Sequence, residues 1–216
     1  MALRLTRIDE LTRGDHWYLG EADECYCLGE YTARKGFAFS ETNQLIANFK
    51  KSVERRGRPD WKYKGAAIRT AGSAFRAALS EAWLARATLV PVPPSKAHAD
   101  PLYDDRMMQM LAVATQGLQA DVRELVRQQA STEAAHLSDV RPTPAQLAAN
   151  YVIDEAAAGG PPPTVIGVFD DLLTTGCHFQ AMKATLAARF PEVPILGMFI
   201  ARRVPDADFD VILEDE

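Results

Sequence analysis

The segment from residue 164 to residue 186 constrains the fold of this chain more than any other. It begins with the apolar run VIGVF, passes through two adjacent acids, Asp170 and Asp171, and ends in an amphipathic helical pattern. This order is typical of a buried parallel strand, a tight loop and the start of a helix. We therefore expect an α/β protein in which this loop follows the end of a strand.

The loop itself contains Thr174-Thr175-Gly176 and suits a phosphate. The start of a helix directs backbone N–H groups and a positive dipole end at one point. Threonine hydroxyls add donors, and glycine lets the backbone approach a ligand closely. The acids would repel a phosphate, but they can accept hydrogen bonds from sugar hydroxyls or hold Mg²⁺ through water. A ribose 5-phosphate fits both halves, and a solvated acidic turn before an ordinary helix cap is the alternative.

The same residues resemble the signature that binds phosphoribosyl pyrophosphate (PRPP) in type I phosphoribosyltransferases, where an acid pair, two apolar residues and Thr-Thr-Gly follow a strand. The resemblance implies that Asp170 and Asp171 also contact Mg²⁺. It implies PRPP binding by a set of eight residues: Ser95, Asp170, Asp171, Thr174, Thr175, Gly176, Cys177 and His178. Cys177 and His178 depart from the family pattern, in which a small residue and a threonine are commoner. His178 either donates to the phosphate or faces solvent.

A second candidate loop, residues 91–96, follows the apolar run at 88–92. A buried strand would deliver Ser95 and Lys96 at its carboxyl end, where open α/β sheets bind ligands. Lys96 is a compact charge suited to a pyrophosphate, and Ser95 offers a hydroxyl and an N–H. A Pro-rich surface loop with a solvated lysine is the alternative. In the family, the pyrophosphate loop also precedes the PRPP loop along the chain.

Residues 25–201 are similar to the ComF-like branch of that family, named for a competence-associated protein, although the zinc-ribbon cysteines common at ComF N-termini are absent. A polar segment with Arg127, His136 and Arg141 would either cover the ligand as a lid or be a solvated loop. Lys96 with Arg106 or Arg127 would stabilise the departing pyrophosphate. His136 is the candidate general base, by residue type only.

Composition excludes several classes of protein. At 216 residues, with 25% charged and 47% apolar residues, the chain suits one globular domain, and a net charge of −5 does not favour nucleic acid. We find no apolar run long enough for a membrane span and no secretory signal, so a cytoplasmic location is the default expectation. Cys25 and Cys27 would share one face of a strand as buried apolar groups, rather than form a metal or redox site.

Alternating strand and helix patterns predict a mostly parallel twisted sheet with helices on both faces. We expect strands at 24–31, 88–92, 165–169 and 195–200, and helices at 40–56, 66–87, 107–118 and after 176. Residues 122–126 are a strand or short helix, 146–153 are weakly structured, 156–163 are a linker, and 210–213 are a possible last strand. Residues 1–60 would form a small appendage packed on a phosphoribosyltransferase-like domain, 61–216, or the two would be one continuous domain.

The resemblance implies a glycosyltransferase of nucleotide metabolism that transfers ribose 5-phosphate from PRPP to a nitrogenous small-molecule acceptor and releases pyrophosphate. One alternative is a PRPP-hydrolysing toxin or defence effector that depletes PRPP and has an antitoxin-like protein partner. Another is a non-catalytic PRPP sensor or regulator. We expect Mg²⁺ as the cofactor and a homo-oligomer, and we expect neither a membrane nor a nucleic acid as a partner.

Overall fold

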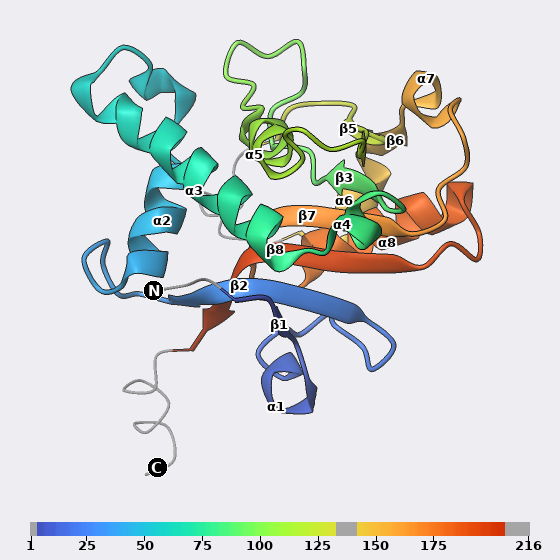
Figure 1. Ribbon diagram of the computed structural model, residues 1–216, viewed down its shortest axis with the longest axis horizontal. Helices are drawn as coiled ribbons and strands as arrows, with labels where there is room; N and C mark the ends of the chain where they lie inside the picture. Colours follow the sequence, from blue (N-terminus) through green and yellow to red (C-terminus); the bar gives the residue numbers. More distant parts are fainter. Residues whose placement is uncertain (1–3, 133–141, 206–216) are drawn as a thin grey trace.

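The computed structural model of the protein describes residues 4–132 and 142–205. Its centre is a six-stranded sheet in the order β1-β2-β8-β7-β3-β4 (Figure 1). The strands are β1 (Thr6–Arg7), β2 (Glu24–Thr32), β3 (Thr88–Pro91), β4 (Asp121–Val122), β7 (Ile166–Leu173) and β8 (Ile195–Val204). The β1–β2 pair is antiparallel and the other pairs in this sheet are parallel. The predicted α/β fold with a mostly parallel sheet is therefore confirmed.

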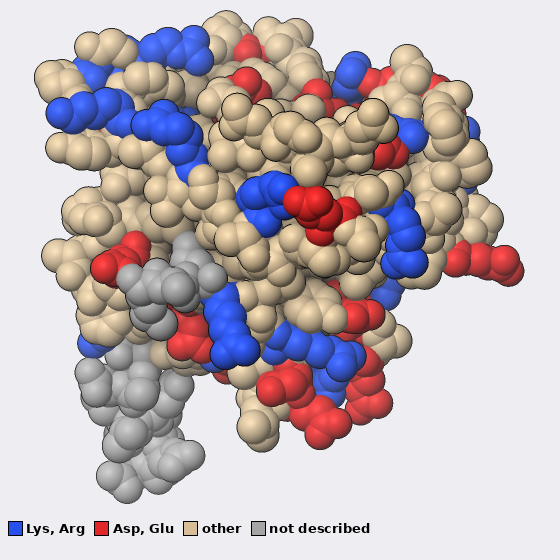
Figure 2. All heavy atoms as spheres, in the orientation of Figure 1, with Lys and Arg blue, Asp and Glu red and all other residues tan. Residues whose placement is uncertain are grey.

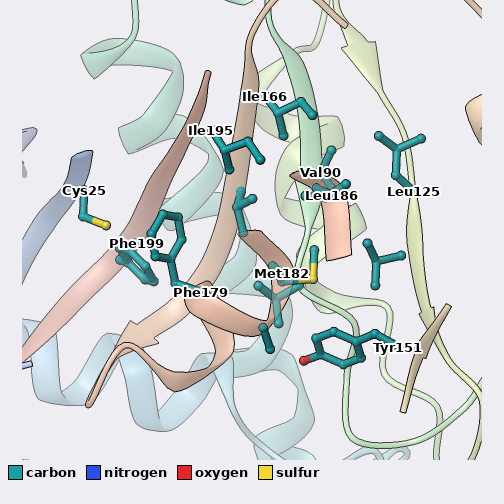
Figure 3. Close-up of a cluster of buried hydrophobic side chains, with 14 of the residues drawn as sticks. Cys25, Val90, Leu125, Tyr151, Ile166, Phe179, Met182, Leu186, Ile195 and Phe199 are labelled. Atoms are coloured by element: carbon teal, nitrogen blue, oxygen red, sulfur yellow. The ribbon is translucent and has the colours of Figure 1, made fainter. Parts of the chain in front are cut away.

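Helices cover both faces of this sheet. On one face lie α2 (Glu41–Phe49), α3 (Lys62–Ala78) and α5 (Arg106–Ala114), whose buried side chains share a cluster with Leu89 and Phe169. On the other face lies α8 (Cys177–Arg189), in a second cluster with Val90 and Val168, part of which Figure 3 shows. Successive strand residues enter opposite clusters because side chains alternate across a sheet. The apolar runs of β3 and β7 thus supply both cores.

The connections after β3 and β7 leave the sheet toward opposite faces. These two strands are neighbours, paired from Thr88 with Ile166 to Pro91 with Phe169. The chain continues from β3 to α5 on one face, and from β7 to α8 on the other. Such a topological switch point is where open α/β sheets form a crevice beyond the carboxyl ends of their strands. The two loops predicted to bind phosphate groups border this position.

A small second sheet lies between β4 and β7 in the chain. It pairs β5 (Val126–Gln128) with β6 (Tyr151–Ile153), and the helices α6 (Pro144–Ala149) and α7 (Glu155–Ala158) flank β6. The expectation of weak structure at 146–153 is wrong. The sequence carried a signal for α6, because Thr143 and Gln146 form a reciprocal capping box and Pro144 occupies the first turn.

Predicted helices are longer than the observed ones. The first ends at Phe49, and residues 50–61 continue through two 3-10 turns, η1 (Val53–Arg55) and η2 (Pro59–Trp61). The second ends at Ala78, and Ser80 then caps the short helix α4 (Glu81–Leu84). Serine side chains at Ser52 and Ser80 accept backbone N–H bonds, so each begins a new turn where apolar periodicity alone suggested continuation. The possible strand at 210–213 lies outside the described residues.

The N-terminal part of the chain contributes directly to the sheet. A short helix, α1 (Glu10–Arg13), separates β1 from β2, and β2 lies between β1 and β8. Cys25 and Cys27 of β2 are buried on one face of the strand, as predicted, and this face is the one that α8 covers. Burial raises the pKa of these thiols to about 12 and about 11, respectively. Within the described ranges, no helix is both long and apolar enough to cross a membrane.

Candidate functional site

The β7–α8 loop, residues 174–176, has a backbone that only glycine suits at its last position. Gly176 is the N-cap of α8 with a φ of +83°, and a Cβ there would lie 2.9 Å from Cδ2 of Leu19. The turn leads directly into the helix, whose first N–H groups have no partner within the helix itself. Loop and helix start therefore have the form of an anion site.

A small hollow opens beside this loop. It brings together most of the predicted ligand-binding residues with an apolar floor, and its lining consists of Asp170, Leu172, Leu173, Thr174, Gly176, Cys177, His178, Phe179 and Phe199. Thr175 belongs to the same loop, and its carbonyl oxygen accepts a hydrogen bond from the N–H of Tyr18 at 2.8 Å. Of the predicted set, only Ser95 lies outside the continuous segment of β7, the loop and α8.

His178 is hydrogen-bonded to a buried tyrosine. The hydroxyl of Tyr151 lies 3.2 Å from Nδ1 of His178. Burial lowers the pKa of His178, and burial followed by the charge of Asp170 raises the pKa of Tyr151. The ring of His178 is therefore neutral and the phenol keeps its proton, and the tautomer of the ring decides which of the two donates in this bond. The tautomer with its hydrogen on Nε2 is the one that can donate to a ligand, as the binding interpretation requires.

The two adjacent acids have different surroundings. Asp170 lines the hollow, and its Oδ1 accepts the N–H of Asp171 at 2.7 Å. Burial, together with the neighbouring charge of Asp171, raises the pKa of Asp170. Asp171 is 3% exposed, and it accepts bonds from Nζ of Lys50 at 3.2 Å and from Nη2 of Arg106 at 2.8 Å. Burial alone would raise the pKa of Asp171, but the effect of these two cations is larger, and the pKa of Asp171 is lowered.

Arg106 is the centre of a buried ion network. Its Nη1 donates to Asp104 at 2.8 Å while Nη2 donates to Asp171. Lys64, only 3% exposed, donates to the same Asp104 carboxylate at 2.7 Å and to the carbonyl of Phe49 at 2.9 Å. The network ties α2, α3 and α5 to β7. Sequence reasoning found Arg106 but assigned it to a ligand rather than to these carboxylates.

One feature of the sequence indicates the buried ion network, namely the position of Lys64 in α3. Lys64 stands at the same helical spacing as the buried residues Ile68, Ala71 and Phe75 of α3. A lysine on the apolar face of a helix is rarely buried without a partner, so it indicates a nearby acid.

Positive charge also gathers on the surface around the start of α3, at the upper left of Figure 2, although the whole chain is acidic.

The second predicted loop starts where β3 ends. The carbonyl of Ser95 accepts the N–H of Thr132 at 2.8 Å, and Lys96 lines a second hollow. The ammonium of Lys96 makes no hydrogen bond or ion pair with the described part of the chain. Its charge is thus available to a ligand, in contrast to that of Arg106.

Around Lys96 lies a polar cluster that sequence reasoning missed. Tyr103 donates to Glu124 at 2.7 Å, and Nε2 of His98 lies 3.5 Å from the same carboxylate. The rings of His98 and Tyr103 stack with centroids 4.1 Å apart. Arg127, considered for a lid, belongs to β5 and forms an ion pair with Asp154. The candidate base His136 and the lid residue Arg141 lie outside the described residues.

No three metal-binding side chains gather within residues 4–132 and 142–205. A divalent cation that kept several waters and bound ligand phosphates would need one or two carboxylates from the protein. Asp170 fits that requirement because it lines the hollow, whereas both oxygens of Asp171 already accept bonds from cations.

No protein-family model matches the chain, and no curated protein matches it either.

Proposed function

We propose that the protein binds PRPP at the switch point between β3 and β7 and transfers its ribose 5-phosphate to a nitrogenous acceptor, with release of pyrophosphate. The observation that carries this proposal is the placement of two complementary loops on neighbouring parallel strands. The β7–α8 loop offers backbone N–H groups and the neutral ring of His178, and the β3 loop offers the ammonium of Lys96, which has no ion-pair partner among the described residues.

The hollow supports a specific orientation of the ligand. The 5-phosphate would accept bonds from the loop amides and Thr174, because a helix start favours an anion. Asp170 would accept hydrogen bonds from the ribose hydroxyls, because no side chain among the described residues donates to its carboxylate. Asp171 would act indirectly, by holding Arg106 and Lys50 beside the site.

Breaking the bond between C1 and the pyrophosphate oxygen creates positive charge on the ribose and negative charge on the leaving group. Lys96 would stabilise that negative charge, since its ammonium forms no ion pair within the described ranges. Bound Mg²⁺, with Asp170 as its protein contact through water, would add neutralising charge on the phosphates. The acceptor nitrogen then forms the new bond to C1, and any proton it carries passes to a base.

The direct experiment mixes purified protein with PRPP and Mg²⁺ and follows pyrophosphate release with and without a panel of nitrogenous bases. Release that requires a base supports the transferase. Equal release without a base supports the hydrolase instead, and tight binding without release supports the sensor. If calorimetry detects no PRPP binding at millimolar concentrations, the proposal is wrong in all three forms.

A further inference from the structure

A short N-terminal segment that does not line the hollow contacts the β7–α8 loop. This N-terminal strap, residues 16–19, lies between α1 and β2. Nδ1 of His16 lies 2.5 Å from the carbonyl oxygen of Thr174, and the N–H of Tyr18 donates to the carbonyl of Thr175 at 2.8 Å. Leu19 packs where a side chain on Gly176 would otherwise lie. Three consecutive loop residues are thus held by three strap residues.

The strap donates hydrogen bonds to two carbonyl oxygens of the loop, and these bonds fix the direction of the loop amides. In a trans peptide the C=O and the following N–H point in opposite directions. With the carbonyls of Thr174 and Thr175 fixed on the strap side, the N–H groups of Thr175 and Gly176 face the other way. Neither N–H has a backbone partner in the described part of the chain. The strap therefore presents both donors to an anion.

The strap is in turn held by the helix that follows the loop. Nε2 of Gln180 in α8 donates to the carbonyl of Tyr18 at 3.0 Å and contacts Asp23 at 2.5 Å. Strap, loop and the first turns of α8 therefore form one closed set of hydrogen bonds. A displacement of the strap would be transmitted to the loop, because its carbonyls would lose their donors.

His16 is an unusual residue for a purely structural position. It is 1% exposed, and its Nε2 is buried without a hydrogen-bond partner among the described residues. Burial lowers the pKa of its ring, so the ring is neutral and Nδ1 carries the hydrogen that the Thr174 carbonyl accepts. An apolar side chain would fill the space without a buried unsatisfied nitrogen. What histidine adds over an apolar residue is the donor to Thr174.

We propose that His16 is a positioning residue that fixes the β7–α8 loop in its anion-binding form. This inference rests on the proposed binding of a sugar phosphate at that loop. His16 does not touch the ligand. It acts through the carbonyl of Thr174, and Tyr18 does the same through the carbonyl of Thr175.

The test compares His16→Leu, which removes the donor, with His16→Asn, whose side-chain amide nitrogen can take the place of Nδ1. Ribose 5-phosphate is the probe, and its affinity is measured by calorimetry for the parent and each variant. We expect His16→Leu to weaken binding by about tenfold, the scale of one hydrogen bond, and His16→Asn to stay within about threefold of the parent. Trp17→Ala is the matched control, because Trp17 is 84% exposed in the same strap.

A second readout separates positioning from general stability. At saturating ribose 5-phosphate, the amide resonances of Thr175 and Gly176 should shift by the same amount in the parent and in His16→Asn, and by less in His16→Leu. If the leucine variant does not fold, His16→Gln replaces it, since its amide lies where Nε2 was and misses the carbonyl.

The outcomes of this test are distinct. If the parent does not bind ribose 5-phosphate, the proposed function fails. If the parent binds and the donor-deficient variant binds equally well, the positioning role of His16 is wrong. Equal losses in His16→Asn and in the donor-deficient variant would also overturn it, because they would show that only the shape of the imidazole matters.

Discussion

Asp170 and Asp171 are adjacent in β7, yet their carboxylates lie on opposite faces of the sheet. Asp170 lines the hollow beside α8, whereas Asp171 accepts bonds from Lys50 of the α2 end and Arg106 of α5. Strand alternation produces this division, since successive side chains point to opposite faces. An acid pair that suggests one ligand-binding unit in the sequence is therefore divided between the hollow and a buried ion network.

The first prediction separates the two acids by mutation. Asp170→Asn should weaken PRPP binding by more than about tenfold, because hydrogen bonds to a charged acceptor contribute about 1.5–3 kcal/mol each. Asp171→Asn should instead lower the free energy of unfolding by about 3–5 kcal/mol, since it removes one of the two carboxylates that pair with Arg106 in the buried network. Calorimetry and urea unfolding on both variants measure the two effects. Equal effects of the two substitutions on affinity and on stability would contradict this division.

The second prediction concerns Lys96. If its ammonium stabilises the departing pyrophosphate, Lys96→Ala should lower turnover more than PRPP affinity, because only interactions stronger in the transition state raise the rate. Loss of one such group raises the barrier by about 2–4 kcal/mol. Steady-state pyrophosphate release and PRPP affinity are measured for the parent and the variant. Unchanged turnover at saturating PRPP would make Lys96 a binding residue only.

The third prediction tests the buried pair of Lys64 and Asp104. Lys64→Met should destabilise the protein by about 3–5 kcal/mol, since it leaves a buried carboxylate short of a partner. Adding Asp104→Asn should recover part of that loss, and the double-mutant cycle gives the coupling energy. Lys62→Met is the control, because Lys62 is exposed one half-turn away and should change stability by less than about 0.5 kcal/mol. A coupling energy near zero would show that the pair is not energetically linked.

The fourth prediction concerns pH. Burial lowers the pKa of His16 in the folded protein, with Asp15, Arg202 and Arg203 as its charged neighbours. The unfolded chain therefore takes up this proton first as pH falls through about 6.5, so the stability that a neutral His16 contributes is present above that pH and is lost below it.

Urea unfolding between about pH 7.5 and about pH 5.5 checks this prediction, over the range in which an unfolded histidine titrates. The difference in the free energy of unfolding between the parent and His16→Asn should shrink as pH falls. Other titrating groups affect both proteins and cancel in this comparison. A difference that stayed constant over the range would mean that the pKa of His16 is the same in the folded and unfolded chains.

Local patterns were sufficient to predict part of this structure. The strand, loop and helix around Gly176 are contiguous in sequence, so periodicity and residue type identify them together. The strand before Ser95 is also local, and the burial of Cys25 and Cys27 follows from their alternation in β2.

Contacts between distant residues could not be predicted in the same way. The partners of Asp171 come from α2 and α5, and His16 reaches Thr174 across 158 positions of the chain. No periodicity links such residues, because only the packing of helices on the sheet brings them together. The lysine on the apolar face of α3 gave a hint that an acid must lie near it, but not which acid.

The pairing of β2 with β8 has a consequence for the order in which this protein folds. The β7–α8 unit can form from local contacts, and β2 can pair locally with β1, but β2 joins the parallel part of the sheet only after β8 has been made. Contacts between such distant parts of a chain form slowly, because a long loop must close first. During synthesis, the N-terminal strap has no loop to hold until almost all of the described chain has been made. The strap–loop contact would therefore be among the last steps of folding, when the early and late parts of the chain meet.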